Sequence, residues 1–255
     1  MNLISLLMLA DSRLPAGTHA HSGGLEAAVA AERVRDAAEL YEFLLGRLTT
    51  TGLTGAAFAA AALNAAGETS GGGGPGVDGP GGDRPNVDGP GGNRPGGAGS
   101  ALLAELDAEY EARTPSPVQR RASRALGRQL LRAARAGWPG PALTAASGVH
   151  PSGPHQPIAF GAAGAAAGLG PQDTAIASAL GAVTGPANAA TRLLGIDPDA
   201  VTAVLAALEP YVQDTADAAL KAALGPISEL PSSSAPRLDI SAEHHSTWEV
   251  RLFAS

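Results

Sequence analysis

The sequence has no cysteine, few aromatic residues and almost no lysine. Its 255 residues include 0 Cys and only 4% aromatic side chains, and Lys221 is the single lysine. The lack of cysteine excludes disulfide scaffolds, zinc ribbons, iron–sulfur clusters and thiol nucleophiles. Lys221 follows no glycine-rich loop, so the chain has no P-loop of its own.

Charge and hydropathy exclude two more classes. The chain carries 24 acidic and 17 basic residues, a net charge of -7, which argues against a basic nucleic-acid-binding protein. Its apolar start, residues 1–10, is too short to span a bilayer and lacks the positive region of a signal peptide. We therefore expect a cytoplasmic protein that binds neither nucleic acid nor a membrane.

Residues 67–101 differ in composition from the rest of the chain. They contain 15 of the 34 glycines and 5 of the 20 prolines, including a repeated decapeptide at Val77–Asn86 and Val87–Gly96. Glycine and proline oppose both helix and sheet, and this stretch has no face to bury. We predict a flexible insertion there.

The remaining sequence has helical patterns and no convincing alternation of period two. Asp36 and Ser116 are predicted N-caps, each followed three residues later by Glu or Gln. Gly52 is expected to end a helix, and Pro186 to kink one. Small residues at 160–169 would let neighbouring backbones approach closely. We predict a single all-α domain, a helical bundle over 1–255, with an extended C-terminal tail at 226–255.

The C-terminal tail is unusually apolar for a chain terminus. Aromatic residues and arginine are enriched at binding hot spots, which favours a segment that orders against a partner protein. The alternative is that the tail folds back on its own core. The candidate partner-binding residues of this segment are Trp248, Arg251, Leu252, Phe253 and Ser255.

The stretch from Leu14 to Glu26 has the pattern of a junction before a helix. Pro15 and Gly17 would reverse the chain, and Ser22 would cap the next helix. Gly24 would allow close packing, and the helix dipole favours an acidic residue in the first turn. The candidate residues for a partner-facing or dimer-facing turn are Pro15, Gly17, Ser22, Gly24, Leu25 and Glu26.

An alternative interpretation of the same stretch is a serine hydrolase. Ala20–Gly24 approximates the G-x-S-x-G nucleophile elbow, with Ser22 as the nucleophile. That motif requires a preceding strand, and the pattern before it here is helical, so we favour the junction.

The histidines give no strong metal signal. They form three loose pairs, and none has the i, i+4 helical spacing with a carboxylate that marks a metal site. We predict no resident metal or cofactor. The weak candidates for transient nickel contact are His19, His21, His244 and His245.

Several motifs in order resemble the urease accessory protein family UreF. They include the opening Leu7-x-Leu-Ala-Asp11, Leu14-Pro-x-Gly17 and His21-Ser-x-Gly-Leu-Glu-Ala-Ala-Val29. Further matches are Arg113-Thr-Pro-Ser116, Arg121-Ala-Ser123, His155-x-Pro-Ile-Ala-x-Gly161, Asn188-Ala-Ala-Thr-Arg-Leu193 and Arg251-Leu-Phe-Ala-Ser255. Together they cover nearly the whole chain outside 67–101.

The resemblance implies an all-α, dimer-forming scaffold without enzymatic activity. It implies that the chain joins UreD (also called UreH) and the GTPase UreG on the urease apoprotein and supports GTP-dependent nickel delivery. Modulation of the GTPase is a further implication. Arg192 is either a partner-binding residue or a charge that caps a neighbouring helix, and both interpretations stay open.

Overall fold

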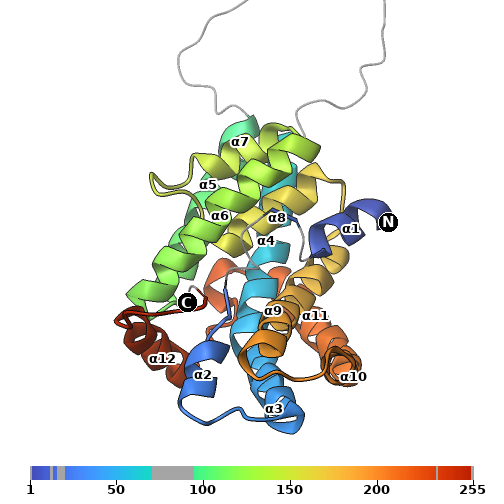
Figure 1. Cartoon of the computed structure of the whole chain (residues 1–255). Helices are drawn as coiled ribbons and strands as arrows, with labels where there is room; N and C mark the ends of the chain where they lie inside the picture. The colour runs from blue at the N-terminus through green and yellow to red at the C-terminus, as the bar shows by residue number, and fades with distance from the viewer. Residues whose placement is uncertain (1, 12–13, 16–20, 71–94, 234, 254–255) are drawn as a thin grey trace, which may run out of the picture.

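The computed structural model describes residues 2–11, 14–15, 21–70, 95–233 and 235–253, which contain helices and no β-strand (Figure 1). The all-α prediction is confirmed. No helix in these ranges is both long enough and apolar enough to cross a membrane. The helices are α1 (Leu3–Ala10), α2 (Leu25–Ala30), α3 (Ala37–Arg47), η2 (Leu48–Gly52), α4 (Leu53–Ser70), α5 (Pro95–Ala112), α6 (Pro117–Gly137), α7 (Pro141–Ser147), α8 (Gln156–Ala166), α9 (Pro171–Leu193), α10 (Pro198–Ala207), α11 (Glu209–Ala223), η3 (Ile227–Glu229) and α12 (Pro236–Ser246).

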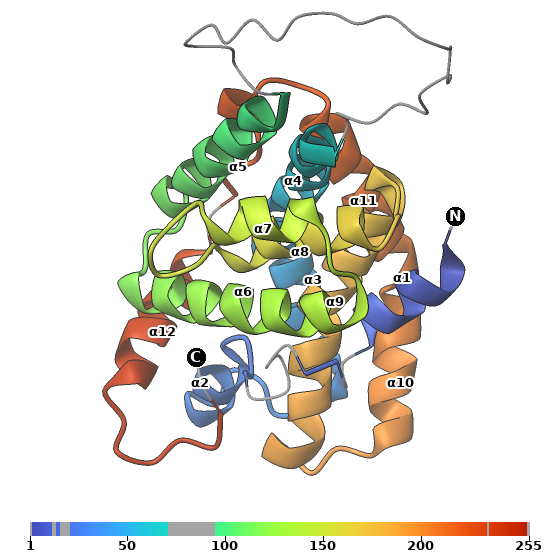
Figure 2. The ribbon, with the colours of Figure 1, turned by 90° about the horizontal axis from the view of Figure 1, so that it is seen from above.

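Helix α4 forms the centre of the core. It packs against α5, α8, α9 and α11, and the views in Figures 1 and 2 show it within the bundle. Its Phe58 is fully buried together with a run of alanines. A Cβ at Gly161 of α8 would lie 2.3 Å from the carbonyl oxygen of Ala59, so glycine is required at this approach. The expected close packing of the 160–169 region is confirmed.

Helices α3 and α4 are joined by a π-helical turn, so the prediction that Gly52 ends a helix is wrong. The π turn, η2, covers Leu48–Gly52 and continues directly into α4. Thr49, Thr50 and Thr51 donate their hydroxyls to carbonyls four residues earlier, at distances of 3.0, 2.6 and 3.3 Å. The threonine hydroxyls thus donate hydrogen bonds to backbone carbonyls where the regular pattern of α-helical hydrogen bonds is interrupted.

The predicted insertion is shorter than expected. Residues 67–70 belong to α4 and residues 95–101 to α5, so both ends of the 67–101 interval are helical. Proline suits the first turn of a helix, and the buried Leu103 and Leu106 anchor α5 in the core. Residues 71–94 lie outside the described part of the chain.

The C-terminal segment returns to the body of the fold. It contains η3 and α12, and α12 packs against α2 and α6 (Figure 2). Phe253 is buried. Of the two alternatives for residues 226–255, folding back on the core is the one that the described residues show.

Candidate functional site

The two regions predicted to bind partners meet at the side chain of Glu26. Its Oε1 accepts a hydrogen bond from the Leu252 backbone N–H at 2.8 Å, and its Oε2 accepts one from the Phe253 N–H at 3.0 Å. His245 Nε2 lies 2.9 Å from the same Oε2, and because an ionised carboxylate only accepts, Nε2 carries the proton. We call Glu26, His245, Leu252 and Phe253 the terminal junction.

The local sequence explains how Glu26 is positioned. Ser22 Oγ accepts the Glu26 backbone N–H at 3.3 Å, so it serves a first-turn donor of α2 as predicted, but the N-cap position itself is Gly24. Gly24 has a φ of +92°, and a Cβ there would lie 2.9 Å from Leu238 of α12. The expected close packing at Gly24 is therefore confirmed, and it brings α12 against the start of α2.

The hydrolase interpretation of Ser22 finds no support in this arrangement. Ser22 is only 1% exposed, and its hydroxyl oxygen serves as a cap for α2. The regular element that precedes it is helix α1, not the strand that a nucleophile elbow requires. Leu25 is fully buried, so it too supports the turn from inside.

The tail residues divide into buried anchors and exposed side chains. The Phe253 side chain is buried, while Arg251 is exposed and Leu252 is 72% exposed. Trp248 is half-buried, and its ring packs on His245 with the ring centroids 4.6 Å apart. Pro15 is exposed on the surface. Gly17, His19 and Ser255 lie outside the described residues.

The described candidate histidines do not converge on one point. His21 lines a cavity, His245 is bonded to Glu26, and His244 accepts a hydrogen bond from Trp248 Nε1 at 3.2 Å. Within the described ranges, no group of three or more His, Asp or Glu side chains has the arrangement of a metal site.

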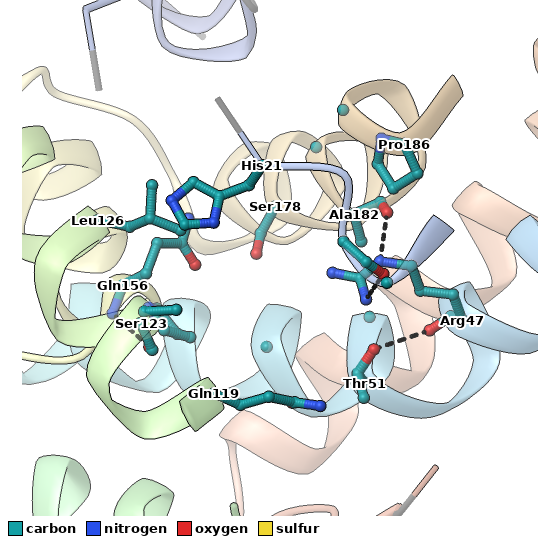
Figure 3. Close-up of a pocket in the computed structure, with 18 of the residues that line it drawn as sticks. His21, Arg47, Thr51, Gln119, Ser123, Leu126, Gln156, Ser178, Ala182 and Pro186 are labelled. Carbon is teal, nitrogen blue, oxygen red and sulfur yellow. Dashed lines mark hydrogen bonds between the residues drawn. The ribbon is translucent and has the colours of Figure 1, made fainter. Parts of the chain in front are cut away.

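A cavity of about 690 Å³ adjoins the terminal junction, because Phe253 is among its lining residues. Figure 3 shows part of its lining. It is lined by His21 and Gly24 from the N-terminal turn, Phe253 from the C-terminus and Arg192 from α9. Helices α6 and α8 contribute Gln119, Ser123 and Gln156 among others. The cavity therefore adjoins both predicted partner-binding regions and Arg192.

No sequence motif indicated Arg47, which holds the N-terminal turn against α9 at this cavity. Its Nε donates to the Ala182 carbonyl and its Nη1 to the Gly23 carbonyl, each at 2.9 Å (Figure 3). The Ala182 carbonyl is available because Pro186, four residues later, has no N–H. Burial lowers the pKa of Arg47. Two features of the sequence could have pointed to Arg47. They are Pro186 within α9, which leaves a carbonyl without a helical donor, and the three threonines at positions 49–51.

A second polar cluster lies between α5, α6 and the start of α8, behind Tyr110, which lines the cavity and packs on His155. Arg124 Nη1 is 3.0 Å from Asp107 Oδ2, and its Nη2 pairs with Glu111. His155 Nε2 is 2.9 Å from Glu111 Oε2, and its backbone N–H donates to Asp107. The hydrogen bond from Arg124, with a further one from His155, lowers the pKa of Glu111 to about 2. Burial lowers the pKa of His155.

Comparison with known proteins gives one consistent result. The sequence model of the UreF family matches residues 34–209. A protein of Mycobacterium sp. (strain JLS) named Urease accessory protein UreF is 40% identical over 253 residues, covering 99% of both chains. One from Mycolicibacterium vanbaalenii is 41% identical over 254 residues, covering 100% of this chain and 99% of its own. One from Mycobacterium tuberculosis (strain H37Rv) is 36% identical over 256 residues, again covering 100% and 99%. All carry that name.

Proposed function

Because this chain belongs to the UreF family of urease accessory proteins, which are not enzymes, we propose that it acts as a scaffold during urease maturation. In this proposal it bridges UreD (also called UreH) and the GTPase UreG on the urease apoprotein in the cytoplasm. Residues 1–255 work as one domain, and the chain forms a homodimer within the complex. It supports GTP-dependent nickel insertion and modulates GTP hydrolysis by UreG.

The observation that carries this proposal is the terminal junction. Glu26 accepts two backbone N–H groups of the C-terminus, which leaves the Leu252 side chain 72% exposed beside the N-terminal turn. The exposed Arg251 adjoins it. The exposed side chains of the C-terminus therefore lie next to the N-terminal turn, whose Ser22, Leu25 and Glu26 are buried and hold it in place. An exposed surface supported in this way suits a protein whose role is to hold partners.

Co-purification with UreD and UreG tests the scaffold role. Arg251→Ala combined with Leu252→Ala removes exposed side chains and leaves the backbone N–H groups that Glu26 accepts. The matched control is Leu224→Ala, because Leu224 is 75% exposed at the end of α11. We expect the double variant to lose recruitment of at least one partner while keeping the helical circular dichroism spectrum. Unchanged recruitment would remove this surface from the proposal.

Nickel activation tests the maturation role. Apo-urease would be incubated with UreD, UreG, GTP, nickel and bicarbonate, with and without this chain. We expect urease activity to depend on the chain and on GTP. Equal activation in its absence would contradict the proposed function.

A further inference from the structure

The cavity beside the terminal junction contains two arginines without a carboxylate partner. Arg47 is held by two backbone carbonyls, and no Asp or Glu of the described residues lies within 4 Å of its guanidinium nitrogens. Arg192 also lines the cavity, is exposed, and its side chain makes no ion pair or hydrogen bond with the described residues. A partly buried guanidinium is stabilised by an anionic partner, so Arg47 is the group in the cavity with most to gain from a carboxylate, whereas the exposed Arg192 is solvated.

The rest of the lining shows what such an anion would be attached to. Leu126 and Phe160 supply apolar walls, while Gln119 and Ser178 supply neutral polar groups. Figure 3 shows Gln119, Ser178 and the Arg47 guanidinium around the same space. A volume of about 690 Å³ is far larger than a simple inorganic ion needs. A ligand that fits this cavity would therefore combine an apolar body with a negative group.

We propose that this cavity receives an acidic side chain of a partner protein, an Asp or Glu flanked by apolar residues, which pairs with Arg47 and, at the rim, with Arg192. This inference rests on the proposed scaffold function and identifies the chemistry of one docking contact. The geometry suits it because two guanidinium nitrogens of Arg47 are already bonded to carbonyls. That fixes the group in place before a partner arrives, so little side-chain entropy is lost on binding.

Charge complementarity limits the occupant to a single carboxylate. Asp11 and Asp239 also line the cavity. Each negative charge of an occupant is repelled by these two carboxylates and attracted by Arg47, so a segment with one acidic residue is favoured over a segment with several. A carboxylate paired with a guanidinium gives a charge-assisted, directional contact.

A peptide titration tests the cavity directly. The probes are acetyl-Leu-Glu-Leu-amide and acetyl-Leu-Gln-Leu-amide, titrated into the full-length chain and followed by amide NMR shifts. We expect the Glu peptide to bind about 10- to 100-fold more tightly than the Gln peptide, the factor expected for one hydrogen bond to a charged group. Equal affinity of the two peptides, or binding of neither at millimolar concentration, would overturn the proposal.

Variants then connect the cavity to the partner complex. Arg47→Met should abolish discrimination between the peptides and weaken co-purification with UreD or UreG. Because Arg47→Met also removes the donors to two backbone carbonyls, Arg192→Ala provides a second variant at an exposed residue. We expect Arg192→Ala to weaken the affinity for the Glu peptide by about 3-fold, a smaller loss than that of Arg47→Met. The matched control is Arg132→Met, on the exposed face of α6.

The outcomes separate this inference from the proposed function. Complex formation that is unaffected by both Arg47→Met and Arg192→Ala would overturn the docking contact and leave the scaffold role intact. If the unmodified chain binds neither UreD nor UreG, the proposed function fails. Selective binding of the Glu peptide would in that case still support the cavity as a site for an acidic segment.

Discussion

Two histidine–glutamate pairs in this molecule have the same separation and different surroundings. His245 and Glu26 are 2.9 Å apart at the terminal junction, and so are His155 and Glu111 between α5 and α8. Glu26 is shielded from solvent, with its side chain 9% exposed, and its other hydrogen-bond donors are backbone N–H groups. The Glu111 side chain is 41% exposed and paired with Arg124.

This difference indicates that the Arg124 cluster stabilises the fold, whereas Glu26 positions the C-terminal segment. Arg124 joins helices that already share a buried core, so that network contributes to the stability of the whole fold. Glu26 instead connects α2 with a chain terminus that has few other anchors, so its loss should release the terminus before it unfolds the protein. Variants of each cluster, taken from the largest expected effect to the smallest, test this division.

Arg124→Met should have the largest effect. The substitution leaves Asp107, whose side chain is 3% exposed, without its cation. Removing one partner of a buried ion pair typically costs about 3–5 kcal/mol, so we expect a large fall in the thermal midpoint by calorimetry. Arg132→Met on the same helix should shift it little. Similar midpoints for the two variants would show that the Arg124 network is not a stability element.

Glu26→Gln should have an intermediate and local effect. An amide has one acceptor oxygen, so at least one of the three donors now served by Glu26 loses its partner, at a cost of about 1.5–3 kcal/mol. We expect faster hydrogen exchange at the amides of Leu252 and Phe253, with the α4 amides unchanged. Glu105→Gln, at an exposed residue of α5, is the control. A uniform increase in exchange across the chain would contradict the local role.

Gly24→Ala should have a smaller effect. The new methyl group would meet Leu238 at 2.9 Å, and the φ of +92° is unfavourable for alanine. We expect a loss of about 1–2 kcal/mol in the free energy of unfolding, measured by urea denaturation. Gly46→Ala has open space around the new Cβ within α3 and should instead stabilise by up to about 1 kcal/mol. Equal changes at both positions would argue against close packing at Gly24.

Acid should weaken the Arg124 network in two stages, with no effect at neutral pH. Burial lowers the pKa of His155 below its ordinary value of 6.5, so its contribution to stability is present above pH 6.5 and is lost as the pH falls. The pKa of Glu111 falls from 4.5 in the unfolded chain to about 2 in the folded protein, so its contribution to stability is lost as the pH falls between those values. We expect Glu111→Gln to flatten the stability profile between pH 4.5 and 2. An unchanged profile there would contradict the role of Glu111.

The features predicted correctly from the sequence are those that depend on residues close together along the chain. Asp36 accepts the N–H of Glu39, and Ser116 that of Gln119, as the capping patterns indicate. Helical periodicity predicted the all-α class for the same reason, because one turn of helix is set by residues three and four positions apart. The error at Gly52 arose because the threonine hydroxyls sustain a π turn that periodicity does not describe.

The tertiary structure alone decided which distant groups meet. Glu26 accepts N–H groups 226 and 227 residues away, and Arg47 reaches a carbonyl 135 residues away. No local pattern encodes these contacts, because they follow from the packing of α12 and α9 against the N-terminal turn. The composition and motifs of the sequence determined the helices, their caps and the family. The contact between the N-terminal turn and the C-terminal segment, with Arg47 at the adjoining cavity, was decided only by the fold.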